Sequence, residues 1–371
     1  MLRPTLSTSL ARHSFRRSNH LLSIPQSRTV TGAAAQKRAG DISDAFVSLS
    51  GGAPVALEPR FADVKKRLIS GREAAIAAAW PRLLSHLREE IERLRDLGSR
   101  AVPEISFAEI AGQKQRNPDF AASYKESGVC VVRGILGEQE ALDLKAAVRA
   151  YITKNPHTKA FPTNDPQVWE LYWSPSQVRA RSHPNFLKTQ RFLMGFWHAD
   201  EHAPISMNHP ISYADRLRLR QPGDAQFALG PHIDGGSVER WEEGGYGLGD
   251  GGKGVYSDIW IGQWEKYDPW DAGVRLGIIS DLYQGVGACS MFRMAQGWLS
   301  MSNVGAGEGH LKVNPMLRGA TAYVLMRPFF EAKRNLEQLG AIDYLKPENW
   351  KMESETTVSI FYFLFLFWPA S

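Results

Sequence analysis

Apolar and polar positions follow a helical period in the first half of the chain. From Phe61 to about Gly98, apolar residues recur every three or four positions with charged residues between them; they are Leu83, Leu84, Leu87, Ile91 and Leu94. The glycine is a typical end for such a helix. A single apolar stripe is typical of a helix that packs against a core, so this segment predicts structure and no functional site.

One strand and several further helices are predicted before residue 200. The β-branched run between Gly128 and Gly134 predicts a short buried strand. A helix with an apolar side, Glu138–Lys154, is predicted directly after this strand. Three more helices are predicted in this half of the chain, at Pro118–Lys125, Pro175–Arg181 and Pro184–His198.

After Tyr213 the pattern changes to runs of five to eight residues separated by glycine turns. Many short strands with turn signals are typical of a sandwich, barrel or jelly roll. We therefore expect a mainly β fold with helices up to about residue 212 and a β core from about residue 213. The predicted strands are Arg216–Arg220, Gln226–Gly230, Gly273–Ile279, Ser290–Ser302, His310–Val313 and Thr321–Arg327.

Composition restricts the class of protein. The chain has 371 residues, of which 43% are hydrophobic and 22% charged, as in ordinary globular domains. It contains only two cysteines, Cys130 and Cys289. Two thiols exclude a disulfide scaffold and a four-thiolate zinc site.

The basic net charge of +5 comes from the first 40 residues. They contain seven Lys and Arg and no acid, so removing their +7 from +5 leaves −2 for the rest. The basic balance is therefore no argument for a nucleic-acid partner, and we expect none. Arg- and Ser-rich segments without acids are typical of mitochondrial targeting. We expect residues 1–40 to be a transit peptide for the mitochondrion, with the matrix as destination, and residues 41–60 to be a linker; a disordered basic tail is the alternative.

The tripeptide His-x-Asp occurs twice. His232 and Asp234 follow a predicted strand, where residues i and i+2 face the same side, so both side chains can reach one metal ion. Imidazole and carboxylate are two thirds of the facial triad of non-haem Fe(II) enzymes. The alternative is a turn-forming Asp beside a solvated His. The other pair, His198 and Asp200, falls at the end of a predicted helix and points in two directions.

Other motifs predict no chemistry. His198 and His202 are four residues apart but Pro204 follows closely, so helix termination is the better interpretation. The glycine-rich stretch 247–254 imitates phosphate-binding loops but lacks the preceding buried strand that they require. The stretch Asp268–Asp271 is interpreted as packing. No Gly-x-Ser-x-Gly elbow is present, and neither cysteine has a basic setting.

Three long segments resemble a known family. They are Phe227–Trp241, Gln296–Ser302 and Ala320–Phe330, and together they are similar to the family called domain of unknown function 1479, over roughly residues 60–357. That family resembles the Fe(II)/2-oxoglutarate dioxygenases near the phytanoyl-CoA type. The resemblance implies a double-stranded β-helix (jelly-roll) core, Fe(II) held by His232 and Asp234, and 2-oxoglutarate as cosubstrate that is converted to succinate and CO₂ during oxidation of a C–H bond.

The implied triad is incomplete in this sequence. A second histidine and a later Arg or Lys for 2-oxoglutarate are expected by resemblance, yet His310 is the only histidine after Asp234. His310 lies before the usual position of the distal ligand and is better explained as a surface histidine. Arg216, Arg218 and Arg220 share one face of a predicted strand, and a solvated face explains them better than carboxylate binding.

The last 14 residues depart from the family pattern. Residues 358–371 form a hydrophobic tail that is shorter than the roughly 20 residues that span a membrane. Val358-Ser359 is what an in-frame splice donor encodes, so we expect a retained intron, with the distal ligand and last strands beyond it. A genuine short isoform with an apolar end is the alternative. The dioxygenase-like domain is then 61–357.

The sequence thus predicts a dioxygenase that hydroxylates an unidentified small molecule, incomplete as written. The alternative is a non-catalytic pseudoenzyme or small-molecule-binding module of the same fold. Neither interpretation includes a nucleic-acid partner or a membrane span.

Overall fold

The structure is a computed structural model. It describes residues 59–112, 117–162, 165–212, 216–219, 233, 238–247, 254–283, 291–305, 308 and 310–353. Contacts divide the chain into Met1–Ala39 and Gly40–Ser371, and every described residue belongs to the second unit. The expected transit peptide, the linker up to residue 58 and the hydrophobic tail lie outside the described residues.

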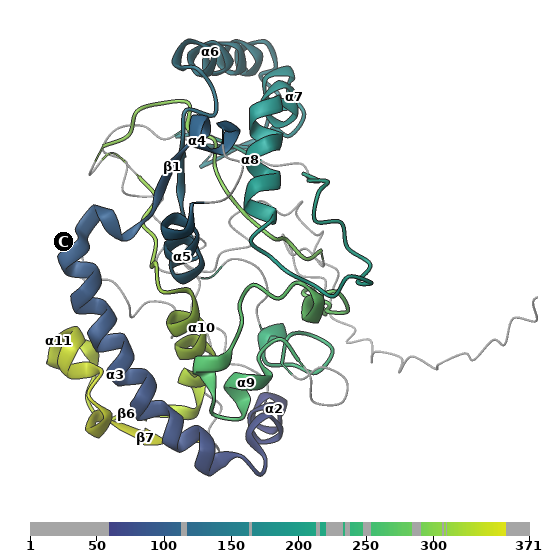
Figure 1. The fold of residues 1–371 in the computed structure, drawn as a ribbon. Coiled ribbons are helices and arrows are strands. Elements are labelled where there is room, and N and C mark those ends of the chain that lie inside the picture. The colour runs from purple at the N-terminus through teal and green to yellow at the C-terminus, as the bar shows by residue number, and fades with distance from the viewer. Residues whose placement is uncertain are drawn as a thin grey trace, which may run out of the picture. The chain divides into compact units, whose positions relative to one another are not determined.

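Helices form most of the regular structure in the described part of the chain (Figure 1). The α-helices are α2 (Arg60–Ile69), α3 (Glu73–Leu97), α4 (Phe107–Gly112), α5 (Pro118–Ser127), α6 (Glu138–Lys154), α7 (Pro175–Ser182), α8 (Pro184–Met194), α9 (Ser257–Trp260), α10 (Leu317–Met326) and α11 (Leu336–Tyr344). Short 3₁₀ turns join them: η2 (Gly98–Ala101), η3 (Val238–Arg240), η5 (Trp264–Lys266), η6 (Gly273–Arg275), η7 (Arg327–Phe329) and η8 (Pro347–Asn349).

The described strands are two or three residues long and form small separate sheets. Strand β1 (Glu104–Ser106) pairs in parallel with β2 (Val131–Arg133), and the crossover between them contains α4 and α5. Strands β3 (Ala160–Phe161), β4 (Val168–Trp169) and β5 (Leu217–Arg218) form an antiparallel sheet in that order. Strand β6 (Phe330–Ala332) pairs antiparallel with β7 (Trp350–Met352).

The prediction of a mainly β fold with a jelly-roll core is wrong. The predicted strand Thr321–Arg327 lies in α10 up to Met326 and at the start of η7, and Gly273–Ile279 begins with the 3₁₀ turn η6. The described residues of Ser290–Ser302 and His310–Val313 are in no strand, whereas Arg216–Arg220 contains the short β5. Gln226–Gly230 lies outside the described residues. In this part of the molecule, the helices α10 and α11 and the 3₁₀ turns occupy the place of the expected β core.

The predictions for the first half of the chain are confirmed in type. Helix α6 has the predicted bounds, and α5, α7 and α8 lie where helices were expected, although α8 ends at Met194. The single predicted helix from Phe61 to Gly98 is two helices, since Gly71 adopts a positive φ of 72° between α2 and α3.

The main core lies where α3 packs on α10 (Figure 1). Trp80 of α3 stacks on Tyr323 of α10 with ring centroids 5.3 Å apart and on Phe330 of β6 at 4.4 Å. The Trp350 ring of β7 meets the Trp80 ring edge-on at 5.2 Å. Large aromatic rings in such contacts bury much apolar area and fix the mutual orientation of the helices.

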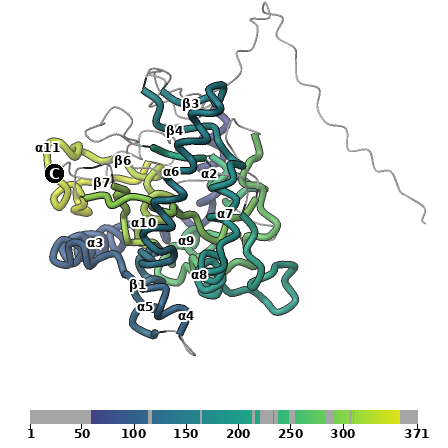
Figure 2. The backbone as a smooth tube through the Cα atoms, turned by 90° about the horizontal axis from the view of Figure 1, so that it is seen from above, coloured from purple at the N-terminus to yellow at the C-terminus, as the bar shows by residue number. Residues whose placement is uncertain are grey.

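Two smaller cores surround this one. The first joins β1, α5 and α8 to the loop before η6, and its aromatic members include Phe120, Tyr124, Phe196 and Trp270. The second holds α6 against the sheet β3–β4–β5 through Val148, Leu171 and Leu217. Figure 2 shows α6, α7 and α8 in neighbouring positions, in agreement with the contacts between α6 and α7 and between α7 and α8.

Candidate functional site

The predicted metal ligands His232 and Asp234 lie outside the described residues. The residue between them, Ile233, is described and exposes 38% of its surface. Among the described residues, no group of three or more His, Cys, Asp or Glu is placed to hold a metal ion. The described part of the chain therefore supplies no complete metal site of its own.

The chain that follows the His-x-Asp motif is anchored in the main core. Val238, Glu239 and Trp241 are buried in and beside η3. The indole Nε1 of Trp241 donates a hydrogen bond of 3.0 Å to the backbone oxygen of Leu325 in α10. Residues 241–247 then form turns, without the buried strand that a phosphate-binding loop requires. The motif thus precedes, by four residues, a segment that is firmly placed.

The other His-x-Asp histidine has a carboxylate partner that the sequence did not indicate. His198 Nε2 donates to Asp268 Oδ2 at 2.7 Å, and Asp268 Oδ1 accepts from the backbone N of Trp270 at 2.8 Å. Burial alone would raise the pKa of Asp268, but the hydrogen bonds from His198 and Trp270 and the charges of His198 and Lys125 lower it below its ordinary value. Both side chains are about half exposed.

A bridge between two chain segments brings this pair together. The backbone N of His198 donates to Trp270 O at 3.0 Å, and the backbone N of Ala272 donates to His198 O at 2.8 Å. His198 therefore pairs in parallel with Asp271, four residues beyond the end of α8. Since the helix has already ended, His198 and His202 do not form the i, i+4 pair that a metal site would need. His202 instead lies 3.3 Å from Glu201.

The same bridge positions a buried arginine. Arg275, in η6, donates from one terminal nitrogen to the backbone oxygen of Asp271 and from the other to the Tyr267 hydroxyl at 3.0 Å. Its guanidinium carbon lies 5.3 Å from the centre of the Trp197 ring. Arg275 exposes 8% of its surface and Tyr267 4%. Neither Arg275 nor Tyr267 was predicted from the sequence, because neither occurs in a recognisable motif. Of the stretch Asp268–Asp271, for which packing was expected, Trp270 packs in the core, whereas Asp268 and Asp271 accept hydrogen bonds.

His310 and the arginines of β5 are placed as the sequence suggested. His310 is exposed, as expected for a surface histidine. Arg216 and Arg218 are exposed on either side of the buried Leu217, which confirms that they share a face. Arg220 lies outside the described residues.

Cys130 is a partly buried free thiol directly before β2. Burial raises its pKa to about 11, so the thiol stays protonated at neutral pH. Cys130 therefore behaves as a packing residue, and no activated nucleophile is present there.

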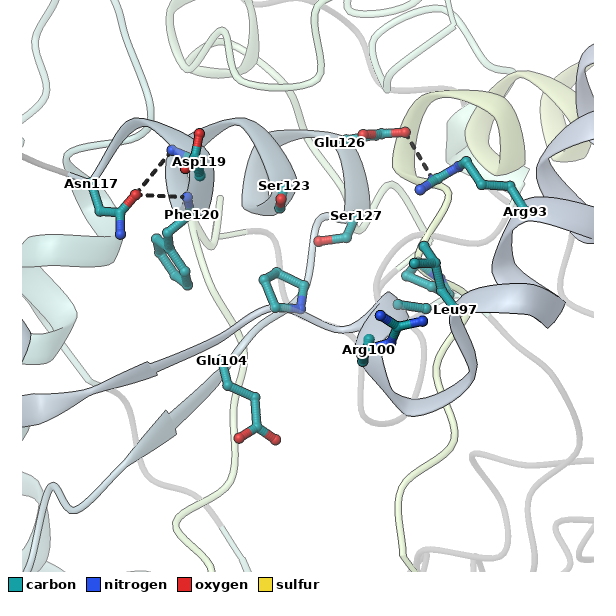
Figure 3. A pocket seen from close by; sticks show the side chains of 13 residues that line it. Arg93, Leu97, Arg100, Glu104, Asn117, Asp119, Phe120, Ser123, Glu126 and Ser127 are labelled. Carbon is teal, nitrogen blue, oxygen red and sulfur yellow. Dashed lines mark hydrogen bonds and ion pairs between the residues drawn. The ribbon is translucent and has the colours of Figure 1, made fainter.

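A pocket of about 490 Å³ opens elsewhere in the molecule, between the end of α3, η2, the start of β1 and α5 (Figure 3). Arg93 at one end pairs with Glu126 at 2.9 Å, and Asn117 at the other caps α5 by accepting from Asp119 N and Phe120 N. Arg100 and Asp119 line it without an ion-pair partner in the described part of the chain. The lining residues include no His or Cys.

Comparison with known proteins establishes the family. Residues 55–360 match the family model described as Gig2-like. The chain belongs to the Gig2-like family. The expected resemblance to domain of unknown function 1479 is thereby confirmed, since GlcNAc Inducible Gene 2, GIG2 (DUF1479), from Candida albicans is similar in structure, with a TM-score of 0.68 and 28% identity over 82% of this chain and 63% of that one.

Two bacterial relatives extend this comparison. The "Putative Oxidoreductase" of Salmonella typhimurium LT2 has a TM-score of 0.64 and 28% identity, and the similarity covers 74% of this chain and 68% of that one. "Uncharacterized protein YbiU" of Escherichia coli (strain K12) is 31% identical over 256 residues, or 65% of this chain and 59% of YbiU. The chain thus spans about three fifths of the length of YbiU and of GIG2.

Proposed function

We propose that this Gig2-like protein is an oxidoreductase that uses Fe(II) and 2-oxoglutarate to hydroxylate a small molecule, with His232 and Asp234 as two of the metal ligands. The observation that carries the proposal is the motif itself, a His-x-Asp that stands in the sequence four residues before the anchored segment Val238–Trp241. The similarity to the Salmonella protein named as an oxidoreductase supports it.

The donor chemistry agrees with the proposal as far as two ligands go. Imidazole nitrogen and carboxylate oxygen are the donors that non-haem Fe(II) sites use. Bound Fe(II) together with 2-oxoglutarate would supply the oxidant for a C–H bond. His198 is hydrogen-bonded to Asp268 and His310 is exposed, and neither belongs to a group of three metal-ligating side chains among the described residues.

The described residues contribute an anchor for the segment that follows the motif. The Trp241–Leu325 hydrogen bond fixes the segment Val238–Trp241 to α10, so the chain is anchored from four residues after the motif onward. The proposal rests on these residues and on the donor set, and it requires no jelly-roll core.

A non-catalytic binding module is the second candidate. It is favoured by one observation on the sequence, that His310 is the only histidine after Asp234. A protein with two ligands would bind Fe(II) weakly and would bind a small molecule without converting it.

Anaerobic titration of the full chain with Fe(II), followed by a succinate assay with 2-oxoglutarate and oxygen, separates these candidates. We expect Fe(II) binding and succinate formation in the wild type, loss of both in His232→Ala and Asp234→Ala, and no change in the matched control His310→Ala. Binding of 2-oxoglutarate with no succinate would identify the binding module. Unchanged Fe(II) affinity in His232→Ala would refute the metal assignment.

A further inference from the structure

The pocket of Figure 3 has an apolar lining that is built from distant parts of the chain. Its volume of about 490 Å³ lies within the range of roughly 300–1,000 Å³ that is typical of small-molecule sites. The apolar lining residues come from the end of α3, from η2, from the segment before β1, from α5 and from the segment before α10; they are Leu97, Ala101, Pro103, Phe120 and Pro315. This lining can receive the carbon skeleton of a small molecule.

Two of the acids in the lining already have partners in the protein. Glu104 accepts hydrogen bonds from Nε and from a terminal nitrogen of Arg133, at 3.1 and 2.6 Å. Glu126 pairs with Arg93 at 2.9 Å, and Arg93 pairs in addition with Glu90 at 2.7 Å. Each of these charged groups has an opposite charge beside it, so none of them requires a ligand.

Arg100 and Asp119 are the two charged lining residues that remain without a partner. Neither side chain forms a hydrogen bond or an ion pair with any part of the chain that the structure describes. The hydroxyl of Ser123 likewise has no hydrogen-bond partner there. Figure 3 shows Arg100 on the side of η2 and Asp119 at the start of α5, with Ser123 between them. The pocket thus offers a ligand one positive group, one negative group and a hydroxyl.

We propose that this pocket binds a small zwitterion, a free amino acid or a dipeptide with an apolar side chain. The guanidinium of Arg100 can donate two parallel N–H groups to the carboxylate of the ligand, and the carboxylate of Asp119 can accept from its ammonium group. The apolar lining contacts the side chain of the ligand. A ligand with a single charge leaves either Arg100 or Asp119 without a partner, whereas a zwitterion provides a partner for both. The site is separate from the residues of the proposed function, and it binds its ligand without a metal ion.

Four matched ligands test which charges the pocket recognises. The full chain in EDTA is titrated by calorimetry with leucine, with leucyl-leucine, with leucinamide, which lacks the negative charge, and with 4-methylpentanoate, which is leucine without its amino group. We expect leucine or leucyl-leucine to bind roughly tenfold more tightly than the two singly charged compounds, because each of those loses hydrogen bonds to a charged group. Equal affinities for all four ligands would overturn the proposal, and so would the absence of binding for both leucine and leucyl-leucine.

Two substitutions assign the recognised charges to residues. Arg100→Gln should weaken the binding of the zwitterion roughly tenfold and leave that of leucinamide unchanged, because leucinamide has no carboxylate for the guanidinium. Asp119→Asn should weaken the binding of the zwitterion by a similar factor and leave that of 4-methylpentanoate unchanged, because that compound has no ammonium group. Arg95→Gln is the matched control, since Arg95 belongs to α3 and pairs with Glu92 outside the pocket.

Wild-type affinity for the zwitterion in both variants would place the ligand elsewhere and overturn the proposal, as would an equal loss of affinity in Arg95→Gln. Arg100 and Asp119 are exposed, so both variants should fold, which far-UV circular dichroism checks. If one variant unfolds, the other decides alone. Failure of the iron assay leaves this result unaffected, because no step of the binding measurement involves metal.

Discussion

Trp241 and Leu325 are joined by a hydrogen bond of 3.0 Å from the indole Nε1 to the backbone oxygen, across 84 positions of the chain. Leu325 belongs to the last turn of α10, where backbone oxygens lack partners within the helix. The indole thus supplies a donor to a backbone oxygen at the end of α10, and it fixes the segment that follows the His-x-Asp motif.

Replacing Trp241 by Phe should lower the free energy of unfolding by about 1–3 kcal/mol, because the buried Leu325 oxygen loses its donor. Urea denaturation measures the change. Trp298→Phe is the control, since Trp298 is 63% exposed and its replacement should change stability little. Equal stability of both variants would show that the hydrogen bond contributes nothing.

Replacement of Gly262 by any residue with a side chain should destabilise the protein. Its φ is +74°, and an added Cβ would lie 2.5 Å from the backbone oxygen of Ala75 in α3. Gly262→Ala should therefore destabilise the protein by roughly 3 kcal/mol or more. Gly71→Ala is the matched control, because its φ of +72° is similar but the added Cβ meets open space. That variant should lose only about 1–2 kcal/mol, as measured by thermal or chemical unfolding.

Lys65 links stability to pH. Burial lowers its pKa to about 8, against the attraction of Glu353, although its ammonium donates to the Glu353 backbone oxygen at 3.1 Å. Between pH 8 and about 10.5 the folded state binds fewer protons than the unfolded state, so this group makes stability rise with pH.

Lys65→Met should remove that contribution. Relative to the variant, the wild type should gain about 1–2 kcal/mol of stability from pH 8 to pH 10, after allowance for solvent screening. Urea denaturation at several pH values measures the difference. Lys66 is an exposed neighbour on α2, so the Lys66→Met variant should keep the wild-type dependence of stability on pH. If the stability of the wild type changed with pH in the same way as that of Lys65→Met, the assignment would be contradicted.

Cys130 should react slowly with thiol reagents. Burial raises its pKa from 9.0 to about 11, so at pH 8 the reactive thiolate is about 100-fold scarcer than for an ordinary cysteine. In a Cys289→Ser background, the rate of alkylation should increase on denaturation by at least this factor. A rate in the folded protein equal to that of the unfolded chain would refute it.

The sequence pattern was sufficient to predict a helix where one helix face is buried and the other is exposed to solvent. Helix α6 was predicted with its observed bounds because Leu144 and Val148 are buried on one side and charged residues cover the other. The pattern failed for α10, where Thr321–Met326 reads as a β-branched apolar run. Gly319, Ala322, Tyr323 and Met326 are buried with a helical period, but Leu325 is buried as well and the remaining apolar residues are partly buried, so the period is concealed.

The candidate site was only partly predictable for a similar reason. His-x-Asp is local in sequence and could be recognised, whereas Asp268 lies 70 residues from His198 and Arg275 has no motif around it. The backbone bridge between His198 and Asp271 and the contact of the Trp197 and Trp270 rings bring these side chains together. Nothing in the local sequence signals that contact.

The hydrogen bond from Lys65 to Glu353 spans 288 residues and joins the first described helix to the end of the last described strand. During synthesis, α2 emerges from the ribosome long before the partner that it needs. A contact between residues so far apart in sequence forms only after the intervening chain has lost loop-closure entropy. We therefore expect the main core to assemble late, after residue 353 has been released, and the exposed apolar faces of α2 and α3 to need chaperone protection until then.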